Sequence, residues 1–134
     1  MTRFSRGLAA ASFILVLLSG CGKPSVSGTV TLDGKPVDGG VISFVADGTN
    51  KQANADIVGG KYDFGAKPGP TAGKNKVEIL WNKKTGRKIP VPGDPGNMTD
   101  ESVQAIPAQY NSASTLTADV KSGANKLDFT LTSR

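Results

Sequence analysis

Short stretches in which apolar and polar residues alternate recur along the chain from residue 26 onward. In residues 26–32, Val26, Val30 and Leu32 fall on one face, and a serine and two threonines fall on the other. A period of two residues is the pattern of a strand with one buried face. The stretches are separated by turn signals such as Asp33-Gly34-Lys35-Pro36. The pattern predicts seven strands, at residues 26–32, 41–46, 53–58, 61–64, 75–81, 115–120 and 126–132. Such spacing is typical of an all-β sandwich or small barrel.

The alternation lapses between residues 82 and 114. This segment contains four prolines and several turn dipeptides, and it predicts a long loop. Loops of this length in a compact domain are usually functional or disordered. Within it, residues 89–91 could add a short edge strand, and Thr99 could cap one helical turn at residues 100–104.

A different pattern precedes the strands. The first seven residues carry Arg3 and Arg6 and no acid, and residues 8–18 are apolar except for Ser12. Small residues, Ser19 and Gly20, follow. A basic start, a short apolar run and a small-residue end are typical of an export signal. A membrane-spanning helix needs about 20 apolar residues, so a permanent transmembrane anchor is the less favoured interpretation.

The only cysteine of the chain, Cys21, comes directly after this signal. Leu18-Ser19-Gly20-Cys21 resembles the lipobox of bacterial lipoproteins at all four positions. The resemblance implies cleavage between Gly20 and Cys21, a diacylglycerol on the Cys21 thiol, and acylation of its new amino group. Two or more acyl chains give a stable membrane anchor, whereas one gives marginal binding. Residues 1–20 would then be the signal peptide and residues 21–25 a short lipidated tether. The alternative is an ordinary secretory cleavage site beside an unmodified cysteine.

The net charge of the chain is small once the predicted signal is removed. The full chain has a net charge of +5, and removing Arg3 and Arg6 with the signal leaves 14 basic and 11 acidic side chains, or +3. A weak, dispersed positive charge gives no reason to expect nucleic-acid binding. The one local cluster, Lys83, Lys84, Arg87 and Lys88, is best interpreted as a solvated hairpin or loop.

Residues 26–134 also resemble known families in two places. The motifs of residues 28–30, 34–36, 40–44 and 60–62 resemble the carboxypeptidase regulatory-like domain. That family has a seven-stranded, transthyretin-like (prealbumin-like) β-sandwich of the Greek-key type, and it does not itself cut peptides. Residues 106–131 resemble the end of a set of small bacterial lipoproteins built on this domain, with matches at Ile106, Pro107, Tyr110, Asn111, Leu116, Val120, Gly123, Asn125, Phe129 and Leu131.

The chain contains no histidine. A zinc peptidase of the usual kind, a Ser-His-Asp triad and a Cys-His dyad all need histidine. We therefore expect no enzyme activity, no catalytic residues, no cofactor and no metal. The alternative is a small envelope hydrolase that uses the loop carboxylates Asp94, Asp100 and Glu101, as paired acids do in glycosidases. The same three residues are the best candidates for a calcium ion, although their spacing is not that of a calcium loop.

Trp81 and Tyr110 are large residues with a polar group that could stack on a sugar or a protein partner. We favour the simpler interpretation that Trp81 ends a core strand and that Tyr110 packs the long loop onto the sandwich. Taken together, the sequence predicts a lipid-anchored, non-catalytic β-sandwich of the bacterial cell envelope. Gly22, in place of an aspartate, favours the outer membrane, with the domain facing the periplasm or the exterior. A protein or polysaccharide of the envelope is the expected partner, and the expected role is binding, adhesion or structural support carried out by loops.

Overall fold

The structure is a computed structural model, and it describes residues 23–65 and 68–134. The predicted signal peptide, the cleavage site at Gly20 and Cys21, and the lipidated cysteine itself lie outside the described residues. The described part of the chain contains eleven strand segments and one turn of 3₁₀ helix: β1 (Ser25–Leu32), β2 (Lys35–Pro36), β3 (Val41–Ala46), β4 (Gln52–Asp56), β5 (Lys61–Asp63), β6 (Gly73–Leu80), β7 (Asn82–Val91), β8 (Asp94–Gln104), η1 (Ala108–Tyr110), β9 (Thr117–Val120), β10 (Ala124–Lys126) and β11 (Phe129–Leu131).

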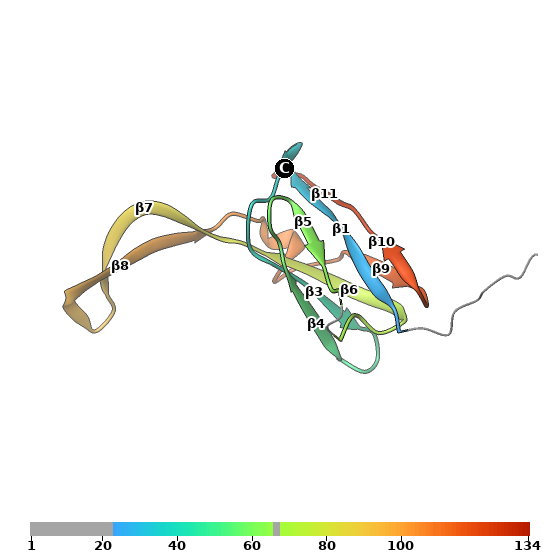
Figure 1. The fold of residues 1–134 in the computed structure, drawn as a ribbon. Coiled ribbons are helices and arrows are strands. Elements are labelled where there is room, and N and C mark those ends of the chain that lie inside the picture. The colour runs from blue at the N-terminus through green and yellow to red at the C-terminus, as the bar shows by residue number, and fades with distance from the viewer. Residues whose placement is uncertain (1–22, 66–67) are drawn as a thin grey trace, which may run out of the picture.

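Two sheets form the body of the molecule (Figure 1). In one sheet, β1 is central, with β10 and then β11 parallel to one of its edges and β5 and β2 antiparallel to the other. The second sheet is antiparallel and has the order β4-β3-β6-β9. The all-β prediction is confirmed, and the arrangement is that of a β-sandwich, with nine strand segments in its two sheets where the sequence predicted seven strands.

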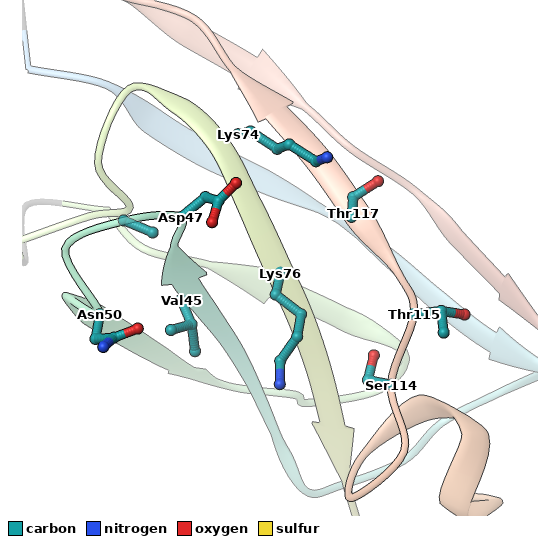
Figure 2. Close-up of a pocket in the computed structure, with 9 residues that line it drawn as sticks. Val45, Asp47, Asn50, Lys74, Lys76, Ser114, Thr115 and Thr117 are labelled. Atoms are coloured by element: carbon teal, nitrogen blue, oxygen red, sulfur yellow. The ribbon is translucent and has the colours of Figure 1, made fainter.

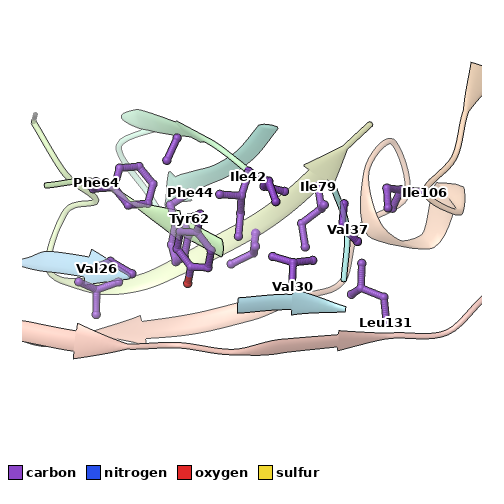
Figure 3. Close-up of a cluster of buried hydrophobic side chains, with 14 residues drawn as sticks. Val26, Val30, Val37, Ile42, Phe44, Tyr62, Phe64, Ile79, Ile106 and Leu131 are labelled. Carbon is purple, nitrogen blue, oxygen red and sulfur yellow. The ribbon is translucent and has the colours of Figure 1, made fainter. Parts of the chain in front are cut away.

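The core fills the space between the two sheets (Figure 3). Phe44 at its centre is fully buried and meets Phe64 edge to face, with 5.5 Å between the ring centroids. The alternation predicted most of these inward positions, and the fully or nearly fully buried apolar residues are Val26, Val30, Val37, Ile42, Phe44, Ile57, Tyr62, Phe64, Val77, Ile79, Ile106, Val120 and Leu131. Within the residues that the structure describes, the buried core extends from Val26 to Leu131.

One strand predicted at residues 126–132 is interrupted at Leu127 and Asp128, without a change of register against β1. The Leu127 N–H donates to the Ser27 carbonyl at 2.8 Å, and the Thr29 N–H donates to the Asp128 side chain at 2.9 Å. The chain approaches β1 so closely here that a Cβ on Gly28 would lie 1.8 Å from the Leu127 carbonyl oxygen. Only glycine fits this position. The Asp128 side chain takes the place of a backbone acceptor for the Thr29 N–H, so the structure has β10 and β11 where the alternation predicted one continuous strand.

The segment predicted as a long loop at residues 82–114 differs most from expectation. Residues 82–104 form an antiparallel two-stranded sheet of β7 and β8, which projects away from the sandwich (Figure 1). We call these residues the arm. The helical turn predicted at residues 100–104 is wrong, because those residues belong to β8. Nowhere in the described part of the chain does the structure have a helix of the length and apolar character that crossing a bilayer requires.

A tight turn closes the arm at its tip. Val91 pairs with Asp94 across Pro92 and Gly93, and Gly93 has a φ of 85°. Proline followed by a residue with positive φ fits a type II turn. Pro90 lies within β7, where it is tolerated because both strands of a two-stranded sheet are edge strands.

Candidate functional site

The arm is almost entirely solvent-exposed, and charged side chains link its strands. All the charged residues of β7 are basic, and all those of β8 are acidic. The Lys84 ammonium lies 2.9 Å from an Asp100 carboxylate oxygen, and Lys88 binds the other oxygen of the same carboxylate. These contacts lie on one face of the arm. Lys88 pairs directly with Asp100, and Lys84 pairs with Ser102, which is two residues from Asp100 on the same strand. Antiparallel neighbours of opposite charge favour this pairing of strands.

A second group of contacts lies at an irregularity in the pairing. Thr85, Gly86 and Arg87 together face Glu101, because the register shifts between Lys84 and Lys88. The Arg87 guanidinium makes two bonds to the Glu101 carboxylate, at 2.8 and 2.7 Å, and the Thr85 hydroxyl donates to it at 2.6 Å. A bidentate guanidinium–carboxylate pair has a fixed geometry. It therefore holds the bulge in one conformation.

These contacts also determine the protonation of the two acids. Hydrogen bonds from Lys84 and then Lys88 lower the pKa of Asp100 from 3.8 to about 2. Hydrogen bonds from Arg87 and then Thr85 lower the pKa of Glu101. Both side chains are therefore carboxylates at neutral pH, each held by cations.

The three carboxylates considered for catalysis or calcium binding do not form one site. Asp100 and Glu101 are consecutive strand residues, so their side chains leave opposite faces of the arm. Asp94 is at the tip, where its carboxylate accepts a hydrogen bond from Asn97. Among residues 23–65 and 68–134, no group of three histidine, cysteine or acidic side chains is placed to hold a metal ion.

Hydrogen bonds fix the base of the arm to the sandwich. The Gln104 side-chain oxygen accepts the N–H groups of Trp81, at 2.8 Å, and of Ile106, at 3.2 Å. Beyond it, the buried Asn111 amide donates to the carbonyls of Ile79, Ile106 and Pro107. The sequence analysis did not assign these roles to Gln104 and Asn111. Because they hold the two ends of the arm together, the arm leaves the sandwich in a defined direction.

The two aromatic residues singled out from the sequence pack as expected. Trp81 and Tyr110 are both partly buried against the core. The Lys83 ammonium lies 5.3 Å from the Trp81 ring centroid, within the range of a cation–π contact. The Tyr110 hydroxyl accepts the Thr132 N–H at 3.0 Å and so ties η1 to the end of the chain.

Exposed apolar side chains are concentrated on the arm. The described residues include five large apolar side chains that are well exposed, and three of them are Ile89, Met98 and Val103, at 37, 55 and 50%. The outer edges of β7 and β8 have no neighbouring strand within the described chain. Unpaired strand edges and exposed apolar side chains are features that bind other chains.

A second feature is a shallow hollow of about 360 Å³ on the outer face of the four-stranded sheet (Figure 2). Ammonium groups of Lys74 and Lys76 and hydroxyl groups of Ser114, Thr115 and Thr117 surround it. Two of these groups already have partners. Lys76 forms a 2.8 Å ion pair with Glu78, and Ser114 donates to the Val77 carbonyl. The hollow is therefore a less developed candidate than the arm.

Comparison of the chain with models of protein families, with curated proteins and with solved structures finds no significant match. The geometry of the molecule and its sequence motifs are therefore the basis for assigning a function.

Proposed function

We propose that the protein is a lipid-anchored, non-catalytic β-sandwich of the bacterial cell envelope, and that it presents the arm to a protein or polysaccharide partner. The observation that carries this proposal is the position of the arm relative to the start of β1. The two lie at opposite ends of the sandwich (Figure 1). A chain anchored just before β1 would hold the arm away from the membrane.

The strand pairing also puts the arm and the start of β1 at opposite ends of the sandwich. The Ser25 N–H donates to the Gly123 carbonyl, and Gly73, the first residue of β6, pairs with Val120. Ser25 and Gly73 therefore lie at one end of the sandwich. β6 runs from there to Leu80 at the other end, where the arm begins. The ten residues of β7, at about 3.3 Å per residue, extend the molecule by a further 30 Å or so.

The motifs shared with the carboxypeptidase regulatory-like domain support a transthyretin-like identity for the sandwich. Residues from two of the matched motifs have clear structural roles in this fold. Gly28 allows the close approach of Leu127, and Phe44 is at the centre of the core. In this proposal the arm is an insertion between β6 and η1 of such a domain.

The anchor is tested by mass spectrometry of the protein purified from membranes. We expect a chain that begins at Cys21 and carries the mass of a diacylglycerol and an acyl group. A Cys21→Ser variant should carry neither. An unmodified Cys21, or a chain that still begins with Met1, would contradict the anchor.

The role of the arm is tested with a photocrosslinking residue placed at Met98 in cells. Val58 is the matched control, because it is also apolar and exposed but lies on the sandwich between β4 and β5. We expect a discrete crosslinked partner from position 98 and none from position 58. Equal products from both positions, or none from either, would exclude the arm as the binding element.

A further inference from the structure

Lysines from four separate segments gather at the end of the sandwich that is opposite to the arm. They are Lys23, just before β1, Lys51, in the turn between β3 and β4, Lys74, on β6, and Lys121, after β9. All four side chains are exposed. We call this region the lysine end.

Contacts between the four segments place them together. The Asp47 N–H donates to the Lys74 carbonyl, and the Ala46 N–H to the Lys51 carbonyl, so the β3–β4 turn lies beside the start of β6. Lys74 pairs with Asp119 of β9, two residues before Lys121. Figure 2 shows Lys74 between the β3–β4 turn and β9.

Lys23 is joined to the same surface through its neighbour Pro24. A Cβ on Gly69 would lie 2.9 Å from the Pro24 carbonyl oxygen, so the two backbones are in contact. Gly69 and Lys51 line one shallow depression. The described chain therefore enters the sandwich among these lysines.

The charges of the lysine end differ from those of the arm. On the arm, Lys84, Arg87 and Lys88 are held by carboxylates. None of the salt bridges within residues 23–65 and 68–134 involves a lysine of the lysine end. Two acids, Asp47 and Asp119, are exposed at this end, so four cations face two carboxylates. The positive charge there is available to a partner outside the chain.

We propose that the lysine end docks on the anionic headgroups of the bilayer that holds the lipid on Cys21. This inference rests on the proposed anchor. Ser25 follows Cys21 by four positions, and an extended chain spans at most about 3.5 Å per residue, or roughly 14 Å in total. The screening length at physiological salt is about 8 Å. A tether this short keeps the lysines within reach of the surface potential of the membrane, and it turns the arm toward the partner.

The test uses residues 23–134, which contain all the core residues that the structure describes, and therefore measures the surface without the lipid. Circular dichroism first verifies that this chain folds. Binding is measured by co-sedimentation with vesicles of phosphatidylethanolamine and phosphatidylglycerol, and with vesicles of phosphatidylcholine alone. We expect binding to the anionic vesicles only. This binding should weaken steeply as the salt concentration rises roughly tenfold, from about 0.05 to about 0.5 M.

A pair of triple variants then locates the surface. Lys51→Gln, Lys74→Gln and Lys121→Gln together should weaken binding by about 100-fold, or about fivefold per lysine. The matched control, Lys35→Gln, Lys61→Gln and Lys83→Gln, removes the same charge from exposed lysines elsewhere and should change binding less than about twofold. Circular dichroism melting verifies that both variants fold.

Equal losses in the two triple variants would show that net charge alone drives binding, and would overturn the proposal. Equal binding of the parent chain to both kinds of vesicle, or no binding at low salt, would also overturn it. None of these three results bears on the anchor, because lipidation of Cys21 is measured separately by mass spectrometry. If Cys21 carries no lipid, the proposed function fails whatever the vesicles show.

Discussion

The sandwich and the arm are both built of paired β-strands, but different forces hold them. In the sandwich, Phe44, Tyr62 and Phe64 are buried between two sheets. In the arm, every residue is exposed or half-exposed, and the contacts that join the strands are ion pairs and side-chain hydrogen bonds. Burial of apolar surface does not depend on charged groups, whereas contacts between exposed charges are screened by salt.

This difference shows how one chain can combine a stable body with an adaptable binding element. A two-stranded hairpin alone is at best marginally stable in water. The arm gains its order from its base, where Gln104 and Asn111 fix both ends, and from the charged contacts along its length. We therefore expect the arm to open locally while the sandwich remains folded. Four predictions test this comparison.

The largest effect is expected in the sandwich core. Phe44→Ala removes a fully buried ring that meets Phe64, Tyr62 and Phe129. We expect the free energy of unfolding in urea to fall by about 3–5 kcal/mol. Met98→Ala on the arm is the matched control, since that side chain is 55% exposed, and it should change the stability by less than about 0.5 kcal/mol. Similar losses from both would mean that the arm shares the core.

A smaller effect is expected where β1 meets the interruption between β10 and β11. A Cβ at Gly28 would meet the Leu127 carbonyl oxygen at 1.8 Å, so Gly28→Ala must displace backbone. We expect a loss of about 1–3 kcal/mol of unfolding free energy. Gly96→Ala on the arm is the control, because the atom nearest to its Cβ would be 3.6 Å away. If Gly28→Ala were as well tolerated as Gly96→Ala, the sandwich would be less closely packed here than the structure indicates.

The sandwich was largely predictable from the sequence, because burial of one face leaves an alternating pattern. Val26 and Val30 on β1 and Val77 and Ile79 on β6 were assigned inward from their spacing, and all four are buried. The pattern failed where local geometry interrupts pairing. The split between β10 and β11 depends on Gly28 and on the Asp128 side chain, which replaces a backbone acceptor.

The arm was missed because neither of its faces is buried, so no apolar alternation marks it. The register shift opposite Glu101 and the proline within β7 also obscure the strand pattern. A usable signal was present. A basic run from Lys83 to Lys88 and an acidic pair at Asp100 and Glu101 flank a Pro-Gly turn. Pairing these opposite charges across the turn would have predicted a hairpin. For Cys21, a sequence motif predicts the role, whereas the residue itself lies outside those that the structure describes.

The smallest effect is expected in the arm and should be confined to it. Asp100→Asn removes the carboxylate shared by Lys84 and Lys88. We expect the backbone amides of the arm to exchange hydrogen faster, as measured by nuclear magnetic resonance, while the melting temperature of the sandwich is unchanged. The control is Asp119→Asn, which removes an exposed carboxylate on β9 that forms no salt bridge within the described chain. It should leave exchange in the arm unaltered.

The same contact predicts a dependence on pH with a definite sign. The pKa of Asp100 is lowered in the folded arm, from 3.8 to about 2, because Lys84 and Lys88 favour its charged form. The stabilisation is therefore complete above about pH 4 and is lost as the pH falls through 2. Once corrected for the intrinsic effect of pH on exchange, protection of the arm should fall over this interval in the parent chain. In Asp100→Asn this part of the dependence should be absent, leaving only that of Glu101. An unchanged pH profile in the variant would mean that the ion pairs do not hold the arm.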